Sequence, residues 1–409
     1  MIFWLMEIMR KSLSIKVPMV FSYYSTRMML AALTSLIISI FLGPRFIKKL
    51  YEMKIGQPIR MEECPLLGQL HQKKKDTPTM GGILILFSML IAMMLWMDPR
   101  SIFTLILLVS TLFLGAIGAR DDYLKLMHKN SKGLSGRKKM LSQIILGAFL
   151  AIYLFNPSIS KALQFGEWYA PPVIKEQTVL RGPQSTQAAL VQHQVSLKEF
   201  ASRLYIPFFK EPVLTFSGSF VILAVFLTIF VVTGSSNAVN LTDGLDGLAT
   251  GCLLMVALCL ALIAFVSNNI DLASYLNIVY IEGSGEIAIY LSAFAGACLG
   301  FLWYNSHPAQ VFMGDTGSLA LGGAIGVSAV LLKREMLLAV IGGIFVVEAL
   351  SVILQVASFK LRNKKRIFLI APLHHHFEYK GWPETKVVIR FWIIGLLLAI
   401  VGLISLKFQ

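Results

Sequence analysis

Four short polar motifs contain most of the residues of this chain that could do chemistry. They read Arg-Asp-Asp-Tyr at 120–123, Asn-Leu-Thr-Asp-Gly-Leu-Asp-Gly at 240–247, Phe-Met-Gly-Asp-Thr-Gly-Ser at 312–318 and Pro-Leu-His-His-His-Phe-Glu at 372–378. Each motif lies where a long apolar segment ends. Because an ionised carboxylate at the edge of hydrocarbon is costly without a compensating partner, these repeated acids indicate a metal, a cationic partner or catalysis.

The acids of two motifs suit the binding of phosphate and a hard cation. Asp121 and Asp122 directly follow the apolar run 101–119, and Asp315 lies between two glycines ahead of a helix that we expect to begin at Ser318. An acid in that position is a common N-cap, and it is also a place where Mg²⁺ and phosphate can meet. For the acid pair, the alternative is a solvated helix end paired with basic neighbours.

The other two motifs offer amides, acids and imidazoles. Asn240, Asp243 and Asp246 supply oxygens in a segment whose glycines let the backbone approach a ligand, the alternative being a polar turn between two spans. Three consecutive histidines cannot all face one point on a regular helix, so we expect them in a loop where two turn inward. A zinc site at these histidines is the alternative, but the carboxylates on this face are hard oxygen ligands that favour Mg²⁺ or Mn²⁺.

Composition places these motifs in a membrane protein. Hydrophobic residues make up 56% of the chain and charged residues 14%, against about 25% charged in an ordinary soluble domain. Apolar runs long enough to cross a bilayer must be helical, because lipid cannot satisfy backbone polar groups. We predict an all-α polytopic fold with about ten transmembrane helices, near 28–47, 80–97, 101–119, 139–155, 218–239, 247–267, 286–304, 318–332, 337–359 and 388–406.

Basic residues give this arrangement a direction. The connections 44–79, 120–138 and 360–387 are rich in Lys and Arg and share one parity, so the positive-inside rule places them and the motifs in the cytoplasm. The net charge of +15 is concentrated in loops that flank the membrane, which favours membrane lipids and phosphate-bearing substrates over nucleic acid. We expect an extracytoplasmic segment at 1–27 and a transmembrane domain at 28–409, with an extracytoplasmic insertion at about 156–217.

A fifth segment, Lys-Lys-Lys-Asp-Thr-Pro-Thr-Met-Gly-Gly at 73–82, could hold phosphate, although it could also be only a charge run that sets topology. Its Gly spacing is not that of a Walker A loop. Taken together, the five segments resemble the polyprenyl-phosphate N-acetylhexosamine-1-phosphate transferase superfamily, and in particular its muramoyl-pentapeptide branch. The resemblance runs from about residue 28 to the C-terminus and leaves out 1–27 and 156–217.

The resemblance implies a reaction and a set of residues. Phospho-N-acetylmuramoyl-pentapeptide would pass from UDP-MurNAc-pentapeptide to undecaprenyl phosphate with Mg²⁺ as cofactor, forming lipid I and UMP at the cytoplasmic face of a bacterial inner membrane. This is the first membrane step of peptidoglycan synthesis, and a homodimer is a further expectation. The implied catalytic residues are Asp121, Asp122 and Asp315, with Asp121 as a base and Asp315 as the metal ligand. The implied substrate-binding residues are Lys74, Thr79, Lys125, Lys129, Asn240, Asp243, Asp246, Asn305, Phe312, His374, His375 and His376.

Two alternative functions fit parts of the same pattern. A sister transferase would move GlcNAc-1-phosphate or a related sugar phosphate, and the triple histidine favours the muramoyl-pentapeptide branch over it. A secondary transporter of an anionic solute would also place acids and broken helices in a membrane. Its binding site, however, would lie near the midplane, whereas these motifs gather at one face.

Overall fold

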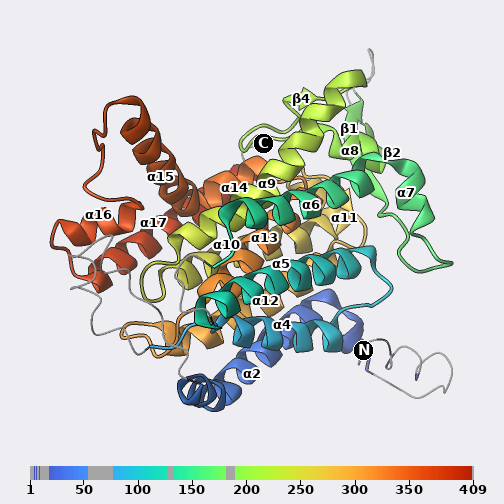
Figure 1. Ribbon diagram of the computed structural model, residues 1–409. Helices are drawn as coiled ribbons and strands as arrows, with labels where there is room; N and C mark the ends of the chain where they lie inside the picture. The colour runs from blue at the N-terminus through green and yellow to red at the C-terminus, as the bar shows by residue number, and fades with distance from the viewer. Residues whose placement is uncertain are drawn as a thin grey trace.

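The computed structural model describes residues 18–53, 77–127, 133–180 and 189–407, with three isolated positions before them. Within these ranges the chain forms a bundle of long helices with a small β-sheet at one end (Figure 1). Nine of the described helices are long and apolar enough to cross a membrane, and one further apolar helix, α4, has 15 residues. The predicted all-α polytopic fold is therefore confirmed.

The nine candidate membrane helices and α4 follow the predicted spans closely. They are α2 (Tyr24–Glu52), α4 (Gly82–Trp96), α5 (Ile102–Met127), α6 (Gly136–Phe155), α9 (Val221–Thr242), α10 (Leu248–Ser267), α12 (Gly285–Asn305), α13 (Gly314–Leu331), α15 (Gly343–Leu361) and α17 (Glu384–Ser405).

Helices α10, α12 and α13 form the buried centre of the bundle, and α2, α4, α5, α9 and α17 pack around them. Small residues make this packing close, as is common between helices in lipid. A Cβ added at Gly322 of α13 would lie 2.7 Å from the Ser235 carbonyl oxygen of α9. A Cβ at Gly118 of α5 would collide with the Asp315 carbonyl oxygen, so only glycine lets α5 and α13 approach at that point.

Three predicted boundaries were wrong, two where polar residues extend a helix and one where a glycine interrupts it. Helix α5 continues past residue 119, so the acid pair lies inside its last turns, and α13 begins at Gly314 rather than Ser318. The single span predicted at 337–359 is two helices, α14 (Glu335–Ile341) and α15, separated at Gly342. Apolar patterning ends at the first charge, whereas helical hydrogen bonds continue wherever polar side chains find partners.

The insertion, whose fold the sequence did not predict, contains most of the short elements. These are α7 (Pro157–Ala162), β1 (Ile174–Leu180), β2 (Ala189–Val195), α8 (Leu197–Ala201), β3 (Arg203–Leu204) and β4 (Leu214–Thr215). Strand β1 pairs antiparallel with β2 and with β5 (Tyr280–Ile281), which gives the order β2-β1-β5, while β3 pairs with β4. The other short elements are η1 (Met19–Ser22), η3 (Gly218–Phe220), α11 (Ile270–Tyr275) and α16 (Leu373–Tyr379).

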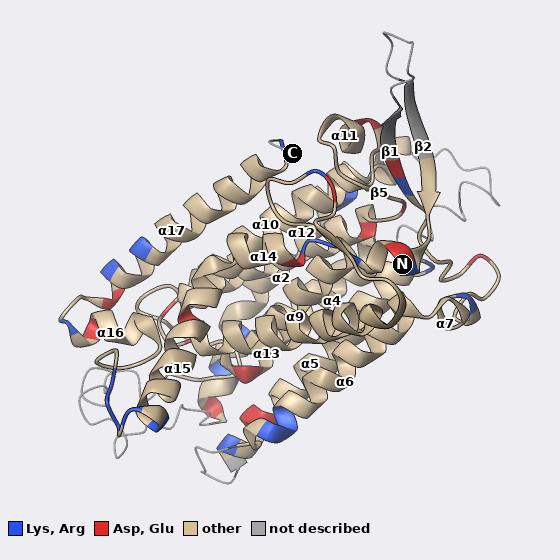
Figure 2. Cartoon of the chain, turned by 90° about the horizontal axis from the view of Figure 1, so that it is seen from above, with Lys and Arg blue, Asp and Glu red and all other residues tan. Residues whose placement is uncertain are grey.

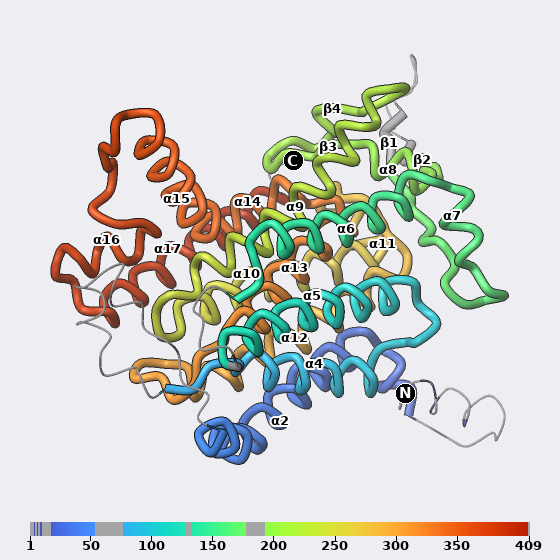
Figure 3. The backbone as a smooth tube through the Cα atoms, viewed as in Figure 1, coloured from blue at the N-terminus to red at the C-terminus, as the bar shows by residue number. Residues whose placement is uncertain are grey.

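Charged residues gather mainly at the two ends of the bundle, and the helical segments between them are largely uncharged (Figure 2). The α15–α16 region lies at the end away from the β-sheet (Figure 3). Charge concentrated at the two ends is expected of helices that cross a hydrocarbon layer, because a charged side chain is costly within that layer.

One buried ion pair connects three helices at the bundle end near the sheet. Arg27 Nη2 of α2 lies 2.7 Å from Glu286 Oε1 of α12, and both side chains are almost fully buried. Arg27 Nε also donates to the Trp96 carbonyl oxygen at 2.7 Å, and the Asp98 N–H donates to Glu286 Oε2 at 3.0 Å. Because α2 begins at Tyr24, Arg27 belongs to this helix and not to a segment that precedes it.

Removing one partner of this pair should destabilise the protein strongly. Arg27→Met leaves the Glu286 carboxylate buried without its cation, so we expect the free energy of unfolding to fall by about 3–5 kcal/mol. The double variant Arg27→Met/Glu286→Gln should recover part of that loss. Thermal unfolding in detergent measures both, with Arg45→Met, an exposed position on the same helix, as control. An Arg27→Met variant as stable as the control would contradict the role of the pair.

Candidate active site

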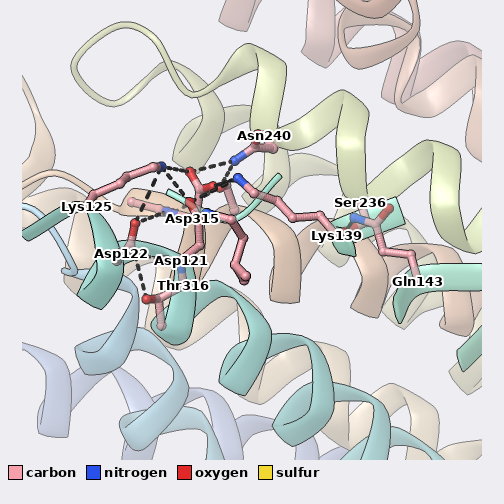
Figure 4. Close-up of polar contacts among 12 residues, drawn as sticks. Asp121, Asp122, Lys125, Lys139, Gln143, Ser236, Asn240, Asp315 and Thr316 are labelled. Atoms are coloured by element: carbon pink, nitrogen blue, oxygen red, sulfur yellow. Dashed lines mark hydrogen bonds and ion pairs between the residues drawn. The ribbon is translucent and has the colours of Figure 1, made fainter. Parts of the chain in front are cut away.

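Three carboxylates and two ammonium groups meet where α5, α6 and α13 come together (Figure 4). Asp121, Asp122 and Lys125 come from the last turns of α5, Lys139 from the first turns of α6, and Asp315 from the first turn of α13. Each of the three acids has a carboxylate oxygen within 4.8 Å of one on the others. With the three acids and both lysines ionised, the cluster carries one net negative charge.

Asp315 lies at the centre of the cluster and uses both of its carboxylate oxygens. Lys125 Nζ lies 3.1 Å from Oδ1, and Lys139 Nζ lies 2.5 Å from Oδ2. The Asn240 amide, from the last turn of α9, donates to Oδ1 at 3.1 Å and to the Ser318 hydroxyl at 2.8 Å. Asn240 and Asp315, from two different motifs, are therefore in direct contact.

Asp121 is completely buried and paired with the same two lysines. Its Oδ2 atom lies 2.7 Å from Lys125 Nζ and 2.9 Å from Lys139 Nζ, while Oδ1 accepts from the Leu134 N–H at 2.6 Å. The contacts therefore include the lysine pairing that was the alternative for this residue. A role for Asp121 as a base stays a prediction.

Asp122 holds the start of α13. It accepts hydrogen bonds from the N–H groups of Asp315 at 3.1 Å and Thr316 at 2.9 Å, and from the Thr316 hydroxyl at 2.6 Å. The N-cap position of α13, Met313, provides no side-chain cap of its own. Asp122 thus caps this helix from α5, which satisfies backbone donors that a helix start leaves unpaired. These contacts favour a positioning role for Asp122.

The acid cluster has a donor set that fits a hard divalent cation. Its oxygen ligands are those that Mg²⁺ prefers, and it contains no sulfur or nitrogen ligand. The two ammonium groups would have to turn away from Asp315 for a metal to approach its oxygens. Asp246, His307 and Glu384 form a second group with ligand atoms within 4.8 Å of one another. The imidazole nitrogen in that group suits Mg²⁺ less well.

The 240–247 motif is fixed by internal hydrogen bonds. The Asp246 carboxylate accepts from the Ala309 N–H at 3.1 Å and lies 3.0 Å from His307 Nδ1. Asn305 Oδ1 accepts from the Gly247 N–H at 3.2 Å and from the Thr250 hydroxyl at 2.9 Å. Both side chains are buried, so their contacts favour a role in shaping this loop.

Asp243 lies beside the acid cluster and is only partly buried. Burial, together with repulsion from the carboxylates of Asp315 and Asp122, raises the pKa of Asp243 to about 8. In the metal-free protein this side chain is therefore mainly protonated at pH 7, which leaves it able to donate a hydrogen bond.

Two further motifs lie next to each other beside the cluster. The Phe312 N–H donates to the Pro78 carbonyl oxygen, and the Gly81 N–H donates to that of Phe312, each at 2.8 Å. Phe312 itself is half-buried. A Cβ added at Gly314 would lie 2.9 Å from Thr79 Oγ1, which brings Thr79 to the start of α13. Two other predicted residues, Lys74 of this loop and Lys129 after α5, lie outside the described residues.

The three histidines lie on the short helix α16 rather than in the predicted loop. The physical reason is Glu348 of α15, whose carboxylate accepts from the Leu373 N–H at 2.8 Å and the His374 N–H at 3.0 Å and so caps α16. His374 is buried and packs against Gly244. His375 Nδ1 lies 2.7 Å from Glu378 Oε2, and His376 Nδ1 accepts from the Leu369 N–H at 3.1 Å. The imidazoles therefore have different environments, as their spacing predicted.

Two residues of this region were missed by the sequence analysis. Lys139 was placed in an apolar span, although Arg137, Lys138 and Lys139 all lie in the first turns of α6. Basic residues are unfavourable at the positive, N-terminal end of a helix unless they have partners. Three basic residues at the predicted start of a span could therefore have indicated that Lys139 has an acidic partner. Glu348 is a single acid within a long apolar run, which by itself indicates a functional or structural partner.

Comparison with known proteins agrees with this geometry. Residues 104–333 match the model of Glycosyl transferase family 4, and residues 74–86 match Phospho-N-acetylmuramoyl-pentapeptide-transferase signature 1. The fold and the site thus define a polytopic membrane transferase of that family.

Curated relatives narrow the assignment. The chain is 67% identical, over the whole of both chains, to Phospho-N-acetylmuramoyl-pentapeptide-transferase of Protochlamydia amoebophila (strain UWE25). It is 45% identical to the protein of that name from Thermodesulfovibrio yellowstonii, over 95% of both chains. For that of Methylacidiphilum infernorum the identity is 46%, over 95% of this chain and 96% of the relative. The chain belongs to the phospho-N-acetylmuramoyl-pentapeptide-transferases.

The capping role of Asp122 can be separated from a direct role in catalysis. Asp122→Ala should lower the free energy of unfolding by about 1–2 kcal/mol, because the first donors of α13 lose their acceptor. Asp122→Asn, which keeps an acceptor oxygen, should lose less. Thermal unfolding and turnover are measured together on both variants. Full stability with no turnover in Asp122→Ala would instead assign this residue to the chemistry.

The raised pKa of Asp243 predicts a pH-dependent gain in stability when this acid is neutralised. Its folded pKa of about 8 lies above the unfolded value of about 3.9, so its contribution to stability is present at low pH and is lost as pH rises toward 8. The difference in unfolding temperature between Asp243→Asn and wild type should therefore be larger, in favour of the variant, at pH 8 than at pH 5. Unfolding is followed with EDTA present, with the exposed Glu167→Gln as control. A pH-independent difference would contradict the shift.

Proposed function

We propose that this protein transfers phospho-N-acetylmuramoyl-pentapeptide from UDP-MurNAc-pentapeptide to undecaprenyl phosphate, in the first membrane step of peptidoglycan synthesis. An oxygen of the acceptor phosphate attacks the β-phosphorus of the nucleotide sugar, the bond to the bridging oxygen breaks, and UMP leaves. Lipid I remains in the bilayer. The observation that carries the proposal is the cluster of three acids and two lysines at one end of an apolar helix bundle.

The cluster suits this reaction because its main difficulty is electrostatic. The attack brings the acceptor phosphate and the pyrophosphate together, and cations must offset their repulsion. Lys125 and Lys139 supply two ammonium groups on long side chains that can turn from the carboxylates to the phosphates. Mg²⁺, when bound, would neutralise further phosphate charge and polarise the reacting phosphorus. Asp315 would hold it, with the oxygens of Asp121 and Asp122 nearby.

The three acids have different proposed roles. Asp121 would take the remaining proton of the acceptor phosphate once the lysines turn toward substrate, a role typically worth 10²–10⁴-fold in rate. Asp122 would act as a positioning residue that fixes the start of α13, and Asp315 would bind the metal. The nucleotide would lie against the 240–247 and 312–318 motifs, where Asp243 and the half-buried Phe312 are accessible and Phe312 could stack on the base. Proposed around them for substrate are Lys74, Thr79, Lys129, Asn240, His375 and His376, while the buried Asp246, Asn305 and His374 would shape the loops that hold it.

The membrane provides the setting for a two-phase reaction. A polyprenyl acceptor would stay in the bilayer with its phosphate at the level of the acid cluster, while the nucleotide sugar arrives from water. We place this end of the bundle in the cytoplasm and the protein in the bacterial inner membrane, on the grounds of the Lys and Arg distribution. A homodimer stays a prediction. The transporter alternative is weakened because Asp121 and Asp315 lie near helix ends and not in the middle of a candidate span.

A direct assay tests the proposed function. Purified protein in detergent is given undecaprenyl phosphate, Mg²⁺ and either UDP-MurNAc-pentapeptide or UDP-GlcNAc, and UMP release is measured. We expect release with the muramoyl-pentapeptide substrate, dependent on the lipid. Release with UDP-GlcNAc alone would favour the sister transferase. Uptake of the nucleotide sugar into proteoliposomes without UMP release would favour a transporter.

The metal role of Asp315 predicts a loss of both activity and metal binding. Asp315→Asn should lower turnover by about 10² or more, because a charge-stabilising group of the transition state is lost. It should also weaken Mn²⁺ binding, measured by electron paramagnetic resonance, in protein that remains folded in detergent. The exposed Asp271→Asn is the control. Near-normal turnover in Asp315→Asn would refute the assignment.

A further inference from the structure

A polar cavity lies at the end of α13 opposite the acid cluster. Asp315 is in the first turn of this helix, and Arg334 follows its last residue, Leu331. The cavity has a volume of about 730 Å³ and is lined by the insertion, the residues around α11 and the α13–α14 connection. Its charged lining residues include Glu176, Arg203, Lys210 and Arg334. It therefore shares no residue with the proposed active site.

Arg334 is the unusual residue of this cavity. Only 6% of it is exposed, yet it lines the cavity. Its guanidinium lies 5.6 Å from the centre of the Tyr205 ring. Within the part of the chain that the structure describes, the Arg334 guanidinium has neither a hydrogen-bond acceptor nor a carboxylate partner.

The neighbouring charges have partners of their own. Lys333 Nζ lies 2.7 Å from Glu335 Oε1, and both of those side chains are buried. Arg203 pairs with Glu176 at 2.5 Å and with Glu199 at 2.7 Å. Among the described residues, Arg334 is therefore the buried cation of this region that no carboxylate contacts directly, whereas Arg203 contacts two.

The backbone holds Arg334 in this position. Lys333 has a φ of +57°, a left-handed conformation that non-glycine residues rarely adopt. The Arg334 N–H donates to the Ala329 carbonyl oxygen at 2.7 Å, which closes the turn after α13. The side chain is thus presented to the cavity by a fixed turn and not by a loose loop.

A buried guanidinium without a partner is expensive, and one aromatic ring offsets only part of that cost, about 0.5–2 kcal/mol. Its planar fork of N–H donors matches the paired oxygens of a carboxylate or phosphate. We propose that this cavity is an anion-binding site in which Arg334 receives the phosphate or carboxylate group of a small polar molecule or of a lipid headgroup. The exposed side chains of Lys210 and Glu211 lie at its mouth. The site is independent of the proposed transferase reaction.

Hydrogen exchange on the full-length, delipidated protein in detergent tests the proposal and locates any binding. Inorganic phosphate, acetate and dihexanoyl-phosphatidylglycerol are titrated separately at constant ionic strength, and amide exchange is followed in segments 203–215 and 273–279, which line the cavity. We expect saturable protection of both segments by at least one probe. Arg334→Gln should raise the apparent dissociation constant at least tenfold. Lys161→Gln, an exposed lysine outside the cavity, should not change it.

The outcomes separate the sources of the anion. Protection by phosphate or acetate identifies a soluble anion, and protection by the lipid alone identifies a headgroup; both support the site. Arg334→Lys keeps the buried charge without the planar fork, so it should bind more weakly than wild type and guards against a misfolded glutamine variant. UMP release should be unchanged in both variants. The proposal fails if no probe protects the wild-type segments, or if the variants titrate like wild type, since the guanidinium would then be only hydrated.

Discussion

Backbone N–H groups cannot remain unpaired in an apolar environment, and this constraint determines how the site of this protein is built. Two helices that carry candidate site residues, α13 and α16, begin without a side-chain cap of their own. Asp122 of α5 supplies the acceptor for α13, and Glu348 of α15 supplies it for α16. Each cap fixes one helix start against another helix. The positions of Asp315 and His374 therefore depend on carboxylates that are distant in sequence.

The second determinant is the balance of charge around Asp315. Lys125 and Lys139 neutralise two of three carboxylates in the protein without substrate, and the same ammonium groups are suited to phosphate when substrate arrives. Buried carboxylates without these lysines would repel one another, and lysines without the carboxylates would be costly so near the hydrocarbon. The cluster is nearly balanced in charge, and its cations are on flexible side chains, which suits the proposed reaction.

These two features also explain what sequence could and could not predict. Hydropathy was sufficient for the spans, and the pairing of Asp121 with Lys125 follows from their i,i+4 spacing on one helix. The boundaries of α5 and α13 were not predictable, because the polar residues there are helical only through partners on other helices. Lys139 and Glu348 were missed for the same reason, and the helical histidines were predicted as a loop. The insertion forms a sheet with β5 through pairing across many residues, for which no local pattern exists.

The absence of a side chain at Gly118 has a consequence for motion during turnover. Because α5 meets the Asp315 backbone directly at that glycine, and Asp122 accepts hydrogen bonds from the first turn of α13, we expect the two helices to move together. The three carboxylates then keep their separations while substrates enter and leave. The groups that reorient would then be the side chains of Lys125 and Lys139. Rotamer changes of unhindered side chains take place on the picosecond-to-nanosecond scale. We therefore expect the proposed reaction to proceed by reorienting cations over a fixed anionic frame, without a hinge between the two helices.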